Sequence, residues 1–213
     1  MSEYEDLKYE EKNGVAKILI NRPDKMNAFR AETCEELLHA LNRAGWNNDI
    51  GVVVLGGAGD RAFCTGGDQS AHGEGDESGY GGRGTIGLPI EDVQSIIRDI
   101  PKPVICRVQG YAIGGGNVLA TLCDFTIASE KAVFGQVGPK VGSVDPGWGT
   151  AYLSRIVGEK KAREIWYLCR RYSAEEAERM GLVNVVVPHD KLDDEIDSWC
   201  AEIMQKSPTA LAI

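Results

Sequence analysis

Three adjacent glycines at a strand-to-helix turn constrain this chain more than any other feature of its sequence. Residues 110–117 read Gly-Tyr-Ala-Ile-Gly-Gly-Gly-Asn, between an apolar strand-like segment at 104–108 and an apolar stretch at 118–122. The second stretch is expected to form a buried helix. Glycine leaves the backbone uncovered, and N–H groups in the first turn of a helix lie at the positive end of its dipole. Such a turn suits an oxygen atom that becomes negatively charged.

A second glycine turn lies upstream, at residues 61–69, and contains Gly66 and Gly67. It also follows an apolar strand, expected at 52–55. Two turns of this kind can each direct one N–H donor at a single carbonyl oxygen. Either turn alone is better explained as an ordinary tight turn, because a lone glycine-rich run is weak evidence. The interpretation therefore depends on the pair.

The charge pattern excludes several classes of partner. The chain has 213 residues, enough for one domain with a sizeable core, and a formal net charge of −9. Lys and Arg are scattered and form no basic stripe, so nucleic acid and anionic membrane surfaces are not expected partners. There is no run of eighteen apolar residues, which argues against a transmembrane helix. The acidic N-terminus lacks a signal-peptide core, and we expect a cytoplasmic protein.

The six cysteines form no C-x-x-C pair and mostly lie among apolar residues. We expect buried free thiols rather than disulfides or a metal site. The three histidines have no metal-ligand spacing, and only His72, beside a glycine-rich loop, is even a remote candidate for chemistry.

Hydrophobic periodicity and turn signals predict alternating strands and helices, which is typical of an α/β fold. Asn13-Gly14 between two strand-like runs predicts a β-hairpin over residues 7–20. Ser173 and Glu176 form a capping box that starts a short helix. Helices are expected at 32–46, 90–99, 152–157, 161–169 and 192–204, and further strands at 51–55, 125–128, 132–134 and 183–187.

Two segments outside these elements carry their own expectations. Residues 70–88 are rich in Gly, Asp, Glu and Ser, and they are long enough for a mobile loop over a site or for a plain surface linker. At 207–213, Ser-Pro followed by Ala and Leu is typical of the start of a helix. We therefore expect that a C-terminal helical piece is missing from this sequence.

The two glycine turns, in this order and at this separation, resemble the crotonase (enoyl-CoA hydratase/isomerase) superfamily. Residues 22–28, Arg-Pro-Asp-Lys-Met-Asn-Ala, also resemble that family's early turn that contacts coenzyme A. The resemblance covers essentially the whole chain. It implies a ClpP-like spiral of stacked ββα units, with a crotonase core at 1–206 and the start of a C-terminal helical segment at 207–213. It also implies trimers or dimers of trimers and acyl-CoA thioester substrates, with coenzyme A as part of the substrate and no tightly bound cofactor.

The resemblance implies that the N–H groups of Gly67 and Gly115 hold the thioester oxygen. Asp68 is expected to pin its turn through local hydrogen bonds rather than to transfer protons. Arg22 and Lys25 either meet coenzyme A phosphates or are simply solvated. The residues expected around coenzyme A are Lys25, Met26, Ala28, Thr65, Asp68, Gln69 and Tyr111.

The chain departs from enoyl-CoA hydratases at two positions. Those enzymes carry one glutamate shortly after the triple glycine and another just after the Phe-Gly-Gln segment, where this chain has Val118 and Gly138. Neither residue can move a proton, so simple hydration of a double bond is disfavoured.

Residues 134–149 and 163–166 instead resemble two relatives that work on rings. The 2-ketocyclohexanecarboxyl-CoA hydrolases open a ring, and the 1,4-dihydroxy-2-naphthoyl-CoA synthases close one by Dieckmann condensation. The segments 109–121, 82–85 and 142–147 look more like the hydrolase. The synthases tend to have His at the position of Asn117 and Phe-Asp-Gly at 144–146.

Opening a β-keto ring needs a base for water and a sink for the departing electron pair. Asp145 is the candidate base or proton shuttle, and its alternative role is an N-cap for the helix that follows. Ser143 is expected to hydrogen-bond the ketone or acyl oxygen, or to be another cap. Tyr80 is a candidate donor from the loop, and is otherwise a surface aromatic residue.

Gln136, Gly138, the Val137 backbone and Trp166 match the bicarbonate pocket of those synthases that have glycine at this position. There the bound bicarbonate acts as the base. Trp166 also fits as a core residue of an apolar helix. Bicarbonate is thus a possible cofactor, more for the synthase interpretation than for the hydrolase. A third class, a non-catalytic crotonase-fold assembly protein, is disfavoured by the two glycine turns and Asp145.

Overall fold

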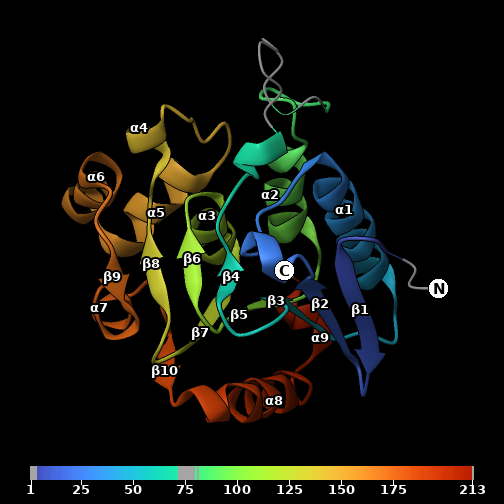
Figure 1. Cartoon of the computed structure of the whole chain (residues 1–213). Coiled ribbons are helices and arrows are strands. Elements are labelled where there is room, and N and C mark those ends of the chain that lie inside the picture. The colour runs from blue at the N-terminus through green and yellow to red at the C-terminus, as the bar shows by residue number, and fades with distance from the viewer. Residues whose placement is uncertain (1–3, 72–79, 81, 213) are drawn as a thin grey trace.

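A computed structural model of the chain describes residues 4–71, 80 and 82–212 (Figure 1). It contains a six-stranded sheet in the order β1-β2-β3-β5-β7-β10 and a four-stranded sheet in the order β4-β6-β8-β9. The strands are β1 (Leu7–Lys12), β2 (Val15–Ile20), β3 (Val52–Gly57), β4 (Ala62–Cys64), β5 (Val104–Val108), β6 (Tyr111–Ile113), β7 (Phe125–Ser129), β8 (Val133–Gly135), β9 (Tyr172–Ser173) and β10 (Val185–Val187).

The predicted hairpin is confirmed. β1 and β2 pair antiparallel, from Leu7 opposite Ile20 to Lys12 opposite Val15. Asn13 and Gly14 both have positive φ, at 51° and 79°. Asn and Gly tolerate this conformation best, and it matches the twist of the two strands.

The central strands β3, β5 and β7 are parallel to one another and buried on both faces. Val53 and Leu55 of β3 belong to the main core. Val52 and Val54, on the opposite face, pack with residues of helix α8 (Leu192–Ile203), which crosses the lower part of Figure 1. Because successive side chains of a strand alternate between faces, one apolar run serves two cores.

Each long parallel strand is followed by a short strand of the second sheet: β3 by β4, β5 by β6 and β7 by β8. This repeat of two strands and a helix is the predicted crotonase architecture. One detail of the prediction is wrong, because β6 lies between β5 and the triple glycine. A strand of three residues is too short to show a period-2 pattern, so the sequence does not reveal it.

The predicted long helices are confirmed within a few residues at each end. α7 has both hydrogen bonds of the predicted capping box, and α9 begins at the predicted Ser-Pro pair. No helix in the described ranges has the length and apolar composition that crossing a membrane requires. The helices not yet given are α1 (Ala31–Trp46), α2 (Ile90–Asp99), α3 (Gly115–Leu122), α4 (Gly138–Val141), α5 (Gly149–Val157), α6 (Glu159–Leu168), α7 (Ala174–Arg179) and α9 (Pro208–Leu211), with 3-10 turns η1 (Pro23–Lys25), η2 (Gln69–Ala71) and η3 (His189–Lys191).

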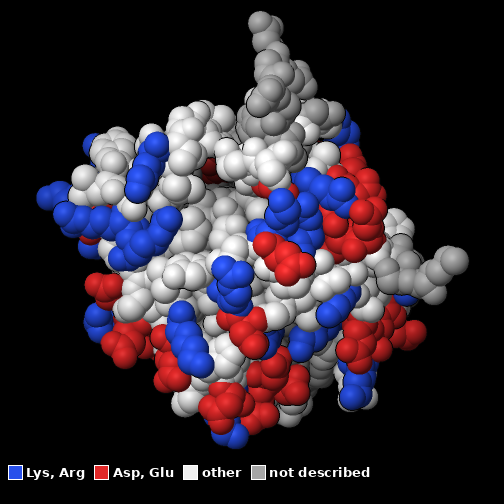
Figure 2. All heavy atoms as spheres, in the orientation of Figure 1, with Lys and Arg blue, Asp and Glu red and all other residues white. Residues whose placement is uncertain are grey.

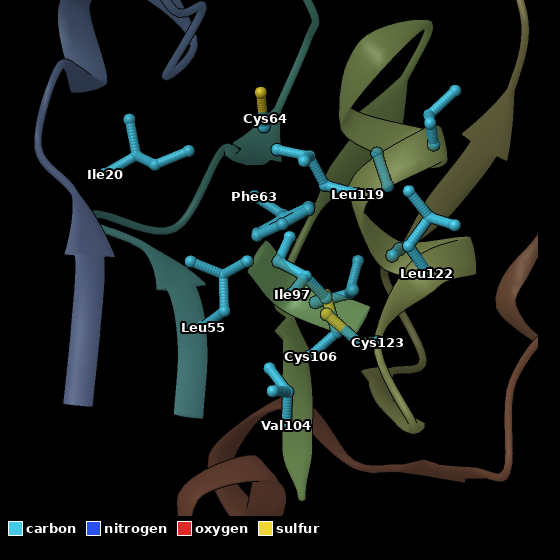
Figure 3. Packing of buried hydrophobic residues seen from close by; sticks show 14 of the residues in the cluster. Ile20, Leu55, Phe63, Cys64, Ile97, Val104, Cys106, Leu119, Leu122 and Cys123 are labelled. Carbon is cyan, nitrogen blue, oxygen red and sulfur yellow. The ribbon is translucent and has the colours of Figure 1, made fainter. Parts of the chain in front are cut away.

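Phe63 of β4 anchors the second sheet in the main core. Its ring lies among Leu55 of β3, Ile97 of α2 and Leu119 of α3 (Figure 3), and all four side chains are at most 2% exposed. Fully burying a side chain of this kind contributes about 1.5–3 kcal/mol. The elements that lead into both glycine turns are therefore fixed by one apolar cluster.

The six cysteines are free, as predicted, and all but the half-buried Cys169 are buried. Three of them, Cys64, Cys106 and Cys123, lie in the same apolar cluster (Figure 3). Burial raises the pKa of the Cys64 thiol to about 12, which keeps it protonated and unreactive at neutral pH.

Candidate active site

The two glycine turns touch. β4 and β6 pair in parallel, so their carboxyl ends meet at one edge of the sheet and both turns begin there. A methyl group added to Gly66 would lie 3.0 Å from the backbone N of Gly115. One added to Gly115 would lie 3.3 Å from Cα of Gly66. The turns, separated by about fifty residues of sequence, thus form one continuous backbone surface.

Two N–H groups on this surface are open. Phe29 bridges in parallel to Gly67, donating its N–H to Gly66 O and accepting the N–H of Asp68. In a parallel bridge the N–H of the middle residue points away from the partner strand. Among the described residues no acceptor pairs with the N–H of Gly67 or Gly115. Both glycines line one cavity, where they can donate to a shared oxygen.

At each of the three adjacent positions, 114, 115 and 116, a different physical reason disfavours a side chain. Gly114 has φ +57° and ψ −123°, a conformation that side chains disfavour. A methyl group on Gly115 would lie 2.6 Å from the Phe29 ring, and one on Gly116 only 2.0 Å from the carbonyl oxygen of Cys64. The turn therefore cannot carry side chains without moving β4 or Phe29.

The first turn is held by an ion pair. The Asp68 carboxylate accepts hydrogen bonds from the backbone N–H and hydroxyl of Ser70 and from Arg22 Nη2 at 2.9 Å. Burial raises the pKa of Asp68, but the bonds from Ser70 and Arg22 outweigh it and hold that pKa below its usual value. The prediction that Asp68 pins the turn is confirmed. Arg22 is not a solvated residue, since its side chain is 14% exposed and also lies 3.5 Å from Asp6.

Most residues predicted to surround coenzyme A gather beside this turn. Thr65 and Gln69 line the cavity. The Thr65 hydroxyl donates to Met26 O at 3.3 Å, which ties the turn to η1 and the adjoining Ala28. Lys25 is exposed, and its ammonium lies 3.3 Å from the Ser70 hydroxyl.

Tyr111 is placed elsewhere. It lies at the opposite end of β6 from the triple glycine, is 44% exposed and does not line the cavity. The geometry therefore gives no support to the expectation that Tyr111 contacts coenzyme A.

The cavity has a volume of about 180 Å³. Figure 2 shows this face of the molecule hollowed in its upper part, with mainly uncharged residues around the hollow. Beyond the glycine turns, the walls come from the start of α2, the start of α3, residues 136–146 and α6. Apolar side chains predominate: Phe29, Ile86, Leu88, Ile90, Val118, Val137, Val141, Val144, Pro146 and Trp166.

Asp145 is the one carboxylate among the described residues that line this cavity. Burial raises its pKa, and the Gln94 amide, which donates to Oδ1 at 3.2 Å, and the Gly147 and Gly149 N–H groups offset part of the rise. The N-cap of α5 is Trp148, whose side chain makes no cap hydrogen bond, while the Gly149 N–H in the first turn of α5 acts on Asp145. Both expected roles of Asp145, the base and the helix cap, fit this geometry. Ser143, half-buried, lines the same cavity.

Tyr80 is buried rather than a surface aromatic residue. Its hydroxyl accepts a hydrogen bond from Gln69 Nε2 at 2.6 Å. A methyl group on Gly67 would lie 2.5 Å from that hydroxyl oxygen, so the hydroxyl sits against the candidate donor. Burial raises the pKa of Tyr80, which keeps the proton available for donation. The remainder of the predicted loop, 72–79 and 81, lies outside the described residues.

The two positions that carry glutamate in hydratases are both at the cavity. Val118 is buried in its wall. At Gly138 an added methyl group would lie 2.8 Å from the carbonyl oxygen of Ser143 and 3.7 Å from the Trp166 ring. Gly138 also accepts the N–H of Ser143. A side chain at 138 would thus require the segment up to Asp145 to move.

The residues expected to form a bicarbonate pocket also meet at this cavity. Gln136, Gly138 and Trp166 all line the cavity, and Gln136 is 2% exposed. The indole Nε1 of Trp166 is buried and has no hydrogen-bond partner among the described residues. Buried donors normally have partners, so this N–H is open to a small acceptor.

Gln94, whose amide contacts Asp145, is a site residue that sequence reasoning missed. Its signal was a polar residue on the apolar face of a predicted helix, beside Ile90, Val93 and Ile97. Such a residue is buried only when its amide is hydrogen-bonded.

Comparison with known proteins agrees with this geometry. The family model described as enoyl-CoA hydratase/isomerase matches residues 10–213. The crystal structure of an enoyl-CoA hydratase from Bacillus anthracis is 31% identical, with a TM-score of 0.89, and the match covers 98% of this chain and 80% of that one.

Two further structures give the same picture. An enoyl-CoA hydratase from Mycobacterium avium subsp. paratuberculosis K-10 is 31% identical, with a TM-score of 0.86 over 98% of this chain and 79% of that one. One from Geobacillus kaustophilus HTA426 is 30% identical, with a TM-score of 0.88 over 99% of this chain and 80% of that one. The chain therefore belongs to the enoyl-CoA hydratase/isomerase family, the crotonase superfamily, whose enzymes bind acyl-CoA thioesters.

Proposed function

We propose that this protein hydrolytically opens the ring of a cyclic β-keto acyl-CoA of the 2-ketocyclohexanecarboxyl-CoA type. One observation carries the proposal. Two open N–H groups line a cavity whose carboxylate is Asp145, while the two hydratase glutamate positions hold Val118 and Gly138. The site is thus equipped to stabilise a thioester enolate and to deprotonate water, and it lacks the acid–base pair for hydrating a double bond.

The reaction follows from these groups. Asp145 takes a proton from water as the oxygen adds to the ring ketone. The bond between the ketone carbon and the α-carbon then breaks, and its electron pair passes to the α-carbon and onto the thioester oxygen. The N–H groups of Gly67 and Gly115 hold that enolate oxygen, and each such donor is typically worth about 3 kcal/mol. Asp145 returns its proton to the α-carbon, which gives an open chain with a carboxylic acid at one end and the thioester at the other.

Tyr80 and Ser143 take supporting roles in this scheme. The Tyr80 hydroxyl lies against Gly67 and serves as a donor to the acyl group or the enolate. Ser143, on the same wall as Asp145, hydrogen-bonds the ring ketone. Coenzyme A lies along the first glycine turn and η1, where the exposed Lys25 is placed to meet a phosphate.

A second candidate function is Dieckmann ring closure of the 1,4-dihydroxy-2-naphthoyl-CoA synthase type. The unpartnered Nε1 of Trp166 beside Gln136 favours it, because a bicarbonate held by these groups would supply a base.

Product analysis separates the two candidates. Incubated with 2-ketocyclohexanecarboxyl-CoA, the protein is expected to yield an open-chain thioester heavier by one water, at a rate independent of added bicarbonate. Mass spectrometry of the products, with and without bicarbonate, checks this. Bicarbonate-dependent ring closure of an open-chain aryl keto-acid thioester, with loss of water, would establish the synthase instead. No turnover of either substrate would favour a non-catalytic protein.

Gly67→Pro tests the first donor, with Gly67→Ala as the matched control. Both substitutions add a carbon that meets the Tyr80 hydroxyl, but only proline removes the N–H. Gly67→Pro is expected to lower kcat by a further factor of about 100–1000 relative to Gly67→Ala, while coenzyme A binding by calorimetry changes little. Equal activity of the two variants would show that this N–H does not hold the oxyanion.

Asp145→Asn separates a base from a structural cap. Loss of a general base is expected to lower kcat by about 100-fold or more. Because the pKa of Asp145 is raised in the native state, stability falls as pH rises through the unfolded pKa towards the folded one. The variant should therefore melt at or above the parent's temperature at neutral pH. A cap would instead give near-normal turnover and a loss of about 1 kcal/mol or less, because Asn is nearly as good an N-cap as Asp.

We also propose that the chain assembles as a trimer or a dimer of trimers. Tyr167 and Leu168 of α6 and Ile156 of α5 leave large apolar side chains exposed, and exposed apolar patches commonly mark interaction surfaces. Light scattering on the purified chain is expected to give three or six times the mass of one chain. A mass of one chain at micromolar concentration would contradict the assembly.

A further inference from the structure

Gln94 occupies an unusual position for a polar residue. It lies on α2 with Ile90, Val93 and Ile97, on the face that enters the core, and is 1% exposed. Burying an amide there is unfavourable unless its donors and acceptor are paired. Both ends of the Gln94 amide have partners, and both partners belong to the segment that carries Asp145.

The orientation of this amide is fixed by chemistry. The backbone N of Trp148 donates to Gln94 Oε1 at 2.6 Å, and a backbone N–H can only donate. The carbonyl end of the amide must therefore face Trp148, which turns its NH₂ group towards Asp145. Nε2 lies 3.2 Å from Asp145 Oδ1. A neutral amide held this way offers Asp145 a donor and no acceptor.

We propose that Gln94 is a positioning residue that holds the Asp145 carboxylate at the cavity in its ionised, proton-accepting form. The inference rests on the proposed function in which Asp145 is the base. It adds that α2, an element outside the glycine turns, determines the direction and charge of that base.

The surroundings of Asp145 explain why such a donor matters. From α3, Val118 faces the carboxylate with an apolar side chain, and a methyl group on Gly149 would meet both Val118 and Asp145 Oδ2. Burial and the charge of Glu91 raise the pKa of Asp145. Hydrogen bonds from Gln94 and from the N–H groups of Gly147 and Gly149 lower the same pKa. Gln94 lowers that pKa more than the N–H group of Gly147 or of Gly149 does.

The same segment has a second attachment to α2 that does not reach Asp145. The indole Nε1 of Trp148 lies 3.2 Å from the Ser95 hydroxyl. Ser95→Ala removes this attachment and leaves the Gln94–Asp145 contact in place. It is thus the matched control for any loosening of the segment.

The test is a titration of Asp145 without substrate. The full-length protein is labelled with ¹³C at aspartate carboxyls, and the Asp145 signal is identified by its loss in Asp145→Asn. Gln94→Met is expected to raise the pKa of Asp145, because a hydrogen bond to the charged form is lost. Gln94→Glu is expected to raise the pKa of the carboxyl pair further, because two neighbouring carboxylates repel. Ser95→Ala should leave it unchanged.

Kinetics supply the second readout. With 2-ketocyclohexanecarboxyl-CoA, the acid limb of kcat/KM is expected to move to higher pH in both Gln94 variants by the shift seen in the titration. At neutral pH we expect kcat to fall about tenfold or more, with the parent profile retained by Ser95→Ala. If Gln94→Met does not fold, Gln94→Glu carries the test, because its carboxylate still accepts the Trp148 N–H.

The outcomes distinguish this inference from the proposed function. A shifted pKa in a parent protein that turns over neither substrate supports the positioning role and refutes the ring-opening activity. An unshifted pKa with an unshifted acid limb, in a protein that loses activity on Asp145→Asn, overturns the inference and leaves the activity standing. An equal pKa shift in Ser95→Ala also overturns it, since the effect would then come from the segment as a whole.

Discussion

Close approach of two backbones is the constraint on which this molecule depends. β4 and β6 are parallel neighbours, and the chain turns at the carboxyl end of each so that Gly66 and Gly115 come into contact. No side chain fits between them, and no covalent bond holds them together. The core beneath them fixes the positions of the two turns. There Phe63 of β4 and Leu119 of α3 lie in one apolar cluster (Figure 3). Pre-positioned N–H groups stabilise a developing charge without reorganising, so in the proposed reaction the rigidity of this core is part of the chemistry.

The polar residues around the turns show how one chemical group takes two roles. Asp68 faces a guanidinium and the Ser70 N–H, its pKa is held low, and it acts as a fixed anchor for the turn. Asp145 faces an amide and backbone N–H groups, forms no ion pair among the described residues, and has a raised pKa. A carboxylate with a raised pKa is the better proton acceptor. The electrostatic surroundings therefore separate the structural aspartate from the candidate catalytic one.

Sequence reasoning succeeded where the signal is local. Asn13-Gly14 determined the hairpin register, and Ser173 with Glu176 identified the start of α7, because turn and cap chemistry depend on neighbours in the chain. It failed for β4, β6 and the four-residue α4, which are too short to show a period. Whether Tyr80 is buried against Gly67 depends on packing between distant segments, and no local pattern encodes it. The family resemblance identified Asp145, whereas Gln94 required the structure, because its partner lies fifty-one residues away.

Glycine at position 138 has a structural consequence for the segment that carries Asp145. The carbonyl oxygen of Ser143 lies where a Cβ at 138 would project, and the N–H of Ser143 bonds back to Gly138. The chain between them is drawn into a tight turn that ends at Gly142, with φ +69°. Asp145 follows shortly after Gly142 and accepts a hydrogen bond from the Gln94 amide. A side chain at 138 would thus displace Asp145, the base of the proposed reaction. The path of the backbone from 138 to 145 therefore excludes a side chain at 138 for as long as Asp145 keeps its present place.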